Sequence, residues 1–197
     1  MNTNIGLDKC LTFINCQLSP TDQLPHLPAK GAPRRVVTLS RQTGSGAHTV
    51  AEKLAEYLQA RDRGASCPWT VFDRNLVEKV LEDHHLPQRL QRYMPEDRIS
   101  EIADIMDELF GLHPPSKTLV QKIAETVLHL AELGNVILVG HGAHVITSKC
   151  AHAFHVRLIG SQERRIEHIQ EIRDLHSRGV DLSFRAMALS QHNAMVY

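Results

Sequence analysis

The chain has 197 residues, of which 42% are apolar and 22% charged, which suits one globular domain with a hydrophobic core. Lys plus Arg and Asp plus Glu both number 22, so the formal net charge is zero. A chain without net charge has no global field that attracts nucleic acid or a membrane surface, and we expect neither partner. No apolar stretch approaches the ~20 residues that a transmembrane helix needs.

The amino-terminal segment and the cysteines favour a cytoplasmic protein. Residues 1–16 lack the basic start and long apolar run of a signal peptide. Four cysteines, at positions 10, 16, 67 and 150, are scattered and form no Cys-x-x-Cys pair. We interpret them as reduced thiols, although an even number also permits disulfides.

The chain divides into two regions near residue 35. Residues 7–17 have the pattern of a short helix, and residues 18–34 carry four prolines, which oppose a regular helix. We therefore expect an arm over residues 1–34, made of a short helix and a proline-rich segment. A compact domain is expected over residues 35–197.

The compact domain opens with a strand, a glycine-rich loop and a helix. Residues 36–39 (VVTL) form a β-prone run, and the loop follows directly. The apolar residues after the loop, which are Val50, Leu54, Tyr57 and Leu58, have helical spacing and predict the buried face of that helix.

Strands and helices continue to alternate along the chain. We expect strands at 70–72, 136–139 and 154–159, and helices at 76–81, 97–110, 117–133 and from Ser161 onwards. The run VILV at 136–139 is apolar on both faces, as in a buried parallel strand. This order predicts an α/β fold with three layers, in which a parallel sheet has right-handed crossovers.

Residues 40–49 (SRQTGSGAHT) are the candidate phosphate loop. A helix amino terminus presents unpaired amides to an anion, and glycines let the backbone approach phosphate oxygens. The pattern departs from G-x-x-x-x-G-K-[ST], because Arg41 replaces the first glycine and Ala47 replaces the lysine. On this motif alone a plain strand–turn–helix remains an open alternative. The residues expected to hold the donor phosphates are Thr43, Gly44, Ser45, Gly46, Ala47, His48 and Thr49.

Several segments, taken together, resemble the cytidylate kinase-like family of P-loop nucleoside monophosphate kinase relatives. They are VVTLSRQTGSGAHTVAEKLAEYL, WTVFDRNLVEKV, MDELFGLHPPSKTLVQKIAETVLHLAELGNVILVGHGAHVIT and FHVRLIGSQERRIEHI. The resemblance extends over about residues 35–175. Members of this family also tend to have S-R-Q-x-G-S-G without the lysine, so Ala47 is not peculiar to this chain.

The resemblance implies a P-loop kinase-like domain that transfers a phosphoryl group from ATP, with Mg²⁺, to a cytidylate-like nucleoside monophosphate. Matched to the family pattern, the catalytic residues are Arg41, Asp73 and Arg164. The resemblance further places Asp73, Arg74 and His141 at the substrate, and Thr49 at the metal. The implied partners are small nucleotides.

Two departures from the family pattern put catalysis in question. His141 stands where the family usually has arginine, and a neutral imidazole lacks the permanent charge of a guanidinium. The chain also ends at Tyr197 without the expected lid arginines and the last strand of the sheet. We therefore keep a second hypothesis, a non-catalytic nucleotide-binding or regulatory protein. An alternative for the short end is a truncated sequence.

Two other features remain open. His141-x-x-His144 and His152-x-x-His155 flank Cys150, which permits a zinc site, but this spacing outside a helix is not specific. We favour histidines that do not converge. An exposed apolar sheet edge would favour pairing with another chain, so a homodimer is a further expectation. A weaker third hypothesis is an interaction module built from the arm and an acidic helix.

Overall fold

The computed structural model describes residues 5–18, 35–62, 67–73, 77, 96–111, 119–140 and 142–177. In chain order the elements are α1 (Ile5–Leu18), β1 (Val36–Arg41), α2 (Ala47–Arg61), β2 (Thr70–Phe72), α5 (Glu96–Phe110), α6 (Leu119–Leu133), β3 (Val136–Val139), α7 (Ala143–Ile146), β4 (Ala153–Leu158) and α8 (Gln162–Ser177). The expected strands and helices are confirmed within these ranges. The proline-rich segment and most of the helix expected at 76–81 lie outside the described residues.

The four described strands form one parallel sheet in the order β2-β3-β1-β4. Val36 at the start of β1 is in register with Val136 of β3 and with Ala153 of β4. All four strands therefore end at the same edge of the sheet, and the glycine loop (residues 42–46) follows β1 at that edge. The predicted α/β class with a parallel sheet is confirmed.

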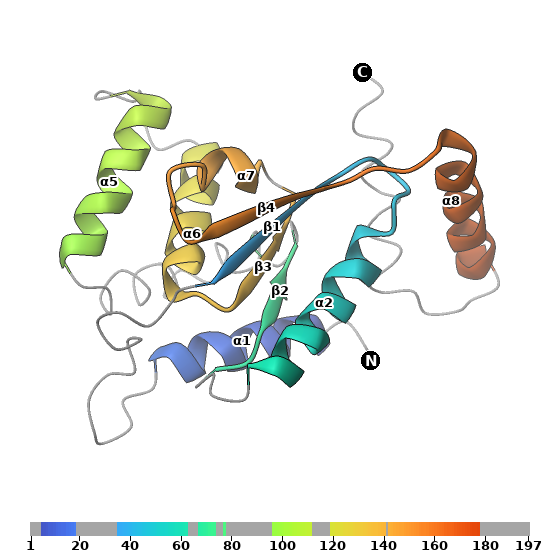
Figure 1. The fold of residues 1–197 in the computed structure, drawn as a ribbon, viewed down its shortest axis with the longest axis horizontal. Helices are drawn as coiled ribbons and strands as arrows, with labels where there is room; N and C mark the ends of the chain where they lie inside the picture. Colours follow the sequence, from blue (N-terminus) through green and yellow to red (C-terminus); the bar gives the residue numbers. More distant parts are fainter. Residues whose placement is uncertain are drawn as a thin grey trace.

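One face of the sheet is covered by the larger apolar cluster. Val136 and Leu138 of β3 point into it and meet side chains from α1, α5, α6 and α7. Residues 126–134 at the end of α6 are all buried, which makes this helix the centre of the layer. Figure 1 shows α6 against the sheet and α5 on its outer side, where the two helices pack together.

The other face is covered by α2, which completes the third layer. Ile137 and Val139 of β3 point to this side, as the alternation of a strand requires. The buried residues of α2 are small: Ala47, Ala51 and Ala55. Leu54 and Leu58 are partly buried, as expected, but Val50 and Tyr57 are 40% and 51% exposed. The predicted apolar face was wrong by part of a turn, because alanines permit the helix to approach the strands closely.

The amino-terminal helix α1 is part of the core. Phe13 and Ile14 are fully buried, and the Phe13 ring meets Phe72 of β2 edge-on, with 5.7 Å between centroids. Cys16 of α1 forms a disulfide with Cys67, just before β2. The expectation of four reduced thiols is therefore wrong for this pair. Residues 51 apart became neighbours through the docking of α1, which cysteine spacing does not reveal.

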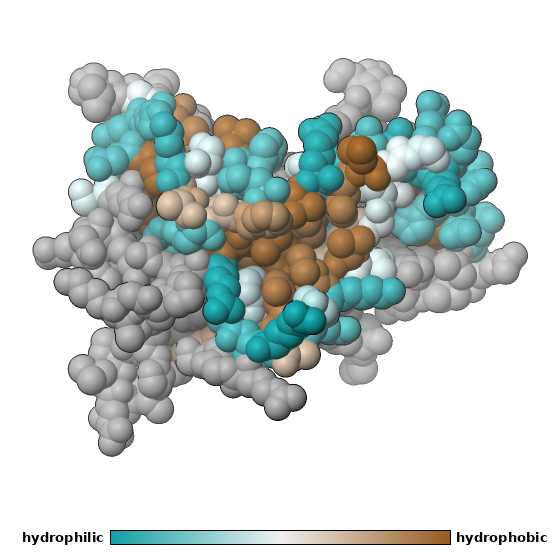
Figure 2. Space-filling model, viewed as in Figure 1, coloured by the Kyte–Doolittle hydropathy of each residue, from teal (hydrophilic) through white to brown (hydrophobic). Residues whose placement is uncertain are grey.

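The edge strand β4 is more exposed than the others. Phe154 is 68% exposed, while Val156 and Leu158 on the same face are partly buried against the α2 side. Figure 2 shows apolar surface gathered over the strands in the middle of the view. Among the described residues no helix has the length and hydrophobicity of a membrane span.

Candidate nucleotide site

The glycine loop forms the junction between β1, which is paired on both sides, and α2. Gly44 and Gly46 have positive φ angles of 83° and 74°, which turn the chain tightly between β1 and α2. The loop is closed by a hydrogen bond from the Ser45 amide to the Gln42 carbonyl at 3.2 Å. Gly46 is the N-cap of α2 and supplies no side-chain cap. The first amides of α2 have no partners within the helix, so they suit an anion.

Helix α8 contacts this loop through two of its side chains, and Figure 1 shows the helix beside the loop. Arg165 donates to the Gly160 carbonyl and to the Thr43 carbonyl, both at 3.1 Å. The His168 ring meets the Gly44 carbonyl at 3.0 Å through Nδ1. A Cβ on Gly44 would lie 2.5 Å from the Arg165 carbonyl oxygen, so only glycine fits there. The loop conformation therefore depends on α8 as well as on its own glycines.

Three charged or titratable side chains from separate segments meet at the carboxyl edge of the sheet. Nδ1 of His48 lies 3.8 Å from Oδ2 of Asp73, whose side chain is 7% exposed. Arg41 interacts electrostatically with both. A Cβ on Gly140 would lie 2.9 Å from Arg41 Nη1, so the glycine after β3 leaves room for the guanidinium.

Burial governs the electrostatics of this group. It lowers the pKa of Arg41, and the carboxylate of Asp73 opposes the change. Burial also lowers the pKa of His48; Asp73 and Glu52 oppose this, whereas Arg41 adds to it. At neutral pH the site thus offers a guanidinium, a carboxylate and a neutral imidazole. Such a set suits a phosphate on the arginine and a hydroxyl or amino group on the carboxylate.

The hydroxyl groups of the loop complete the site. Ser45 Oγ is buried and makes no hydrogen bond to any described residue. A buried hydroxyl without a partner costs about 1–3 kcal/mol, so this position is suited to an added ligand. Thr49 is partly buried in the first turn of α2. Both oxygens are hard donors of the kind that Mg²⁺ takes together with nucleotide phosphates.

The remaining predicted residues fall into two groups. Arg164 is exposed on the first turn of α8, where its amide lies 3.5 Å from Ser161 Oγ. Arg74 and His141 lie outside the described residues. Sequence reasoning missed the contacts of Gln42 and His168 with their neighbours, since both depend on the docking of α8 and its preceding segment against the loop. Gln42 accepts a hydrogen bond from the Gly160 amide at 3.1 Å, which ties the loop to the segment before α8.

A parallel α/β sheet with a glycine loop at its carboxyl edge is an arrangement that many nucleotide-binding proteins use. The chain belongs to the cytidylate kinase-like family, whose model matches residues 36–182. It is similar to a solved structure described as an uncharacterized protein from Eubacterium ventriosum ATCC 27560. That likeness covers 82% of this chain and 71% of that chain, at 18% identity and a TM-score of 0.40. The chain has no significant match among curated proteins.

Proposed function

We propose that this protein binds ATP with Mg²⁺ at the glycine loop and transfers a phosphoryl group to a nucleoside monophosphate of the cytidylate type. The observation that carries the proposal is the meeting of Arg41, His48 and Asp73 beside the loop. Positioning and charge stabilisation account for most of the catalysis of phosphoryl transfer, and this arrangement provides both.

Each group has a role in the proposed reaction. Arg41 and the amides at the start of α2 hold the donor phosphates, in place of the lysine that Ala47 replaces. The Ser45 and Thr49 hydroxyls would hold the metal, which would neutralise charge on the phosphates when bound. Asp73 orients the acceptor nucleotide. Arg164, which is exposed at the start of α8, would reach the transferring group when nucleotide is present.

Calorimetric titration tests the proposal. The purified chain is titrated with Mg²⁺–ATP and then with CMP, and the products are separated by chromatography. Formation of ADP and CDP supports the kinase proposal. Binding of ATP without turnover rejects the kinase and supports the second candidate below, and absence of ATP binding rejects both.

The second candidate is a non-catalytic nucleotide-binding or regulatory protein. The observation that favours it is the contact of Arg165 and His168 with the loop, since these basic side chains of α8 are employed in holding backbone carbonyls. The absent lysine at Ala47 does not by itself favour it, because members of the family also tend to lack that lysine.

The proposed cytoplasmic location follows from the substrates, because ATP and nucleoside monophosphates are abundant there. The Cys16–Cys67 disulfide provides a test, since cytosolic proteins rarely keep disulfides. Alkylation of thiols at lysis, followed by mass spectrometry, reports the state of the pair in the cell. A fully oxidised pair would contradict a reducing compartment.

A further inference from the structure

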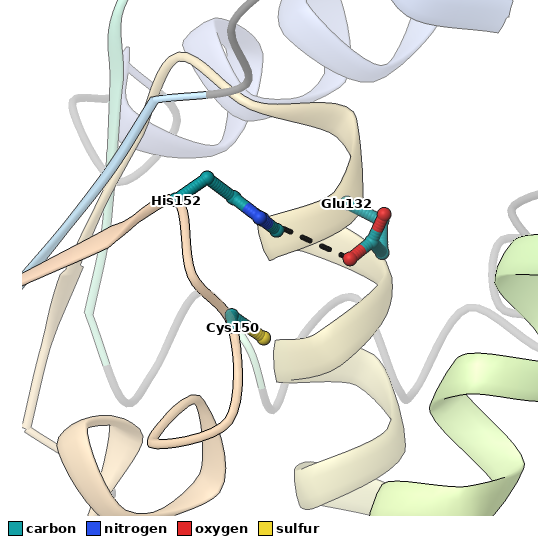
Figure 3. Close-up of side chains that lie close together, drawn as sticks. All are labelled: Glu132, Cys150 and His152. Atoms are coloured by element: carbon teal, nitrogen blue, oxygen red, sulfur yellow. Dashed lines mark ion pairs between the residues drawn. The ribbon is translucent and has the colours of Figure 1, made fainter.

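A second group of chemically reactive side chains lies at the end of the sheet opposite the glycine loop. Glu132 is in the last turn of α6, just before β3, whereas Cys150 and His152 lie in the turn before β4. One donor atom of each side chain lies within 4.8 Å of the other two. Figure 3 shows the three side chains pointing toward one another from two separate segments.

Such deep burial is unusual for side chains that can carry a charge. Glu132 is 2% exposed and Cys150 is 4% exposed, and Cys150 belongs to the larger apolar cluster. A carboxylate in such surroundings is costly unless it is paired or coordinates a metal. A divalent cation bound by a carboxylate, a thiolate and a neutral imidazole gives a site with no net charge. The charges of the three side chains would therefore balance that of a divalent cation.

The spacing of the donor atoms is compatible with metal ligands, and Glu132 and His152 already lie at ion-pair distance (Figure 3). Oε1 of Glu132 and Nε2 of His152 are 3.7 Å apart, which is longer than an N–H···O hydrogen bond of about 2.7–3.2 Å. Two ligand atoms of a tetrahedral zinc are separated by roughly 3.3–3.6 Å, given Zn–N, Zn–O and Zn–S bonds of about 2.0–2.3 Å. Small rotations of the side chains would bring all three donors to one centre.

The donor types select the class of metal. Magnesium and calcium prefer oxygen ligands only, whereas zinc and similar ions take nitrogen and sulfur as well. We propose that Glu132, Cys150 and His152 bind Zn²⁺ or a similar divalent transition-metal ion. The His152 side chain is 21% exposed, so a solvent molecule would supply the fourth ligand.

The metal would have a structural role. It links the end of α6 to the turn that leads into β4, and the carbonyl of His152 accepts a hydrogen bond from the Val36 amide at 3.3 Å. Binding would thus fix the starts of both β1 and β4. The described histidines do not converge with one another, as the sequence interpretation favoured: His152 lies beside Cys150, whereas His155 bonds Thr38 Oγ1 at 2.7 Å and His144 is exposed.

Cobalt titration of the full chain tests the site, because Co²⁺ reports a thiolate ligand by a charge-transfer band in the near ultraviolet. We expect one Co²⁺ per chain, with a band that Zn²⁺ displaces, and a higher melting temperature with Zn²⁺ than with a chelator. Absence of Co²⁺ binding, or binding without the thiolate band, would overturn the proposal.

Matched variants identify the ligands. Cys150→Ser should abolish the band and Cys10→Ser should keep it; the opposite pattern would assign the metal elsewhere and overturn the site. His152→Gln should weaken Co²⁺ binding at least ~10-fold, while His144→Gln should not. Equal weakening by the two histidine substitutions would count against the site. Even if a ligand variant fails to fold, the wild-type and Cys10→Ser spectra show whether a thiolate other than that of Cys10 binds the metal.

Discussion

Arg41 is partly buried at the end of β1, close to Asp73 and against Gly140. If it replaces the missing lysine, Arg41→Ala removes a charge-assisted contact with phosphate worth about 1.5–3 kcal/mol. We expect ATP affinity to fall about 10- to 100-fold, as measured by calorimetry. Arg61→Ala is the control, because Arg61 lies at the far end of α2, over the Tyr57 ring. Equal affinity in Arg41→Ala and wild type would remove this role.

His48 predicts a dependence of stability on pH. Its pKa is lowered in the folded protein, mainly by burial, so the unfolded chain binds the proton more readily. The stability that neutral His48 contributes is present above the unfolded pKa of about 6.5 and decreases as pH falls below it. His48→Gln should reduce the loss of unfolding free energy between about pH 7 and 5, measured by urea titration. His144→Gln, at an exposed residue of α7, should leave the loss unchanged.

At the scale of elements, the packing of α8 on the glycine loop is expected to fix the conformation of the loop. Gly44→Ala adds a Cβ that meets the Arg165 backbone, and both left-handed φ and overpacking oppose it. We expect a loss of about 2–4 kcal/mol in unfolding free energy and weaker nucleotide binding. Gly111→Ala is the matched control, with a φ of 81° and nothing within 4 Å, and should cost only about 1–2 kcal/mol. Equal losses of unfolding free energy in the two variants would mean that α8 shifts to admit the added Cβ without a loss of stability.

The two neighbouring arginines of α8 should behave differently. Arg165→Ala removes the hydrogen bonds to the Thr43 and Gly160 carbonyls, so we expect lower nucleotide affinity and faster hydrogen exchange in the loop. Arg164 is exposed, and among the described residues its side chain makes no hydrogen bond or ion pair with the loop, so Arg164→Ala should change turnover rather than loop exchange. Faster loop exchange in Arg164→Ala alone would reverse this assignment.

At the scale of the whole molecule, the Cys16–Cys67 disulfide joins α1 to the start of β2 across 51 residues. Its removal should cost about 2–4 kcal/mol of unfolding free energy, since it restrains the unfolded chain. The measurement is thermal unfolding of Cys16→Ser with and without reductant, beside wild type. Wild type should gain two titratable thiols on reduction and approach the stability of the variant. An unchanged melting temperature of wild type on reduction would mean that the disulfide contributes nothing to stability.

The oligomeric state is another property of the whole molecule. The homodimer expected from the sequence stays a prediction, and light scattering checks it against a monomer mass of 22.1 kDa. We expect twice that mass at micromolar protein. A mass of 22.1 kDa at every concentration would exclude the dimer.

The sequence by itself determined the α/β class, most strand positions and the candidate loop, because these follow from local patterns. Strands 70–72 and 136–139 match β2 and β3, and the loop lies between β1 and α2 as expected. Local spacing also predicted the helix after the loop but only part of its buried face, because the alanines that pack there carry little apolar signal.

Only the tertiary structure decided which distant residues meet. Asp73 reaches His48 because β2 and β1 end at one edge of the sheet, with β3 between them. The disulfide and the group of Glu132, Cys150 and His152 likewise join segments far apart in the chain. Such contacts depend on strand order and helix docking, which result from burial of the whole apolar surface rather than from any local pattern.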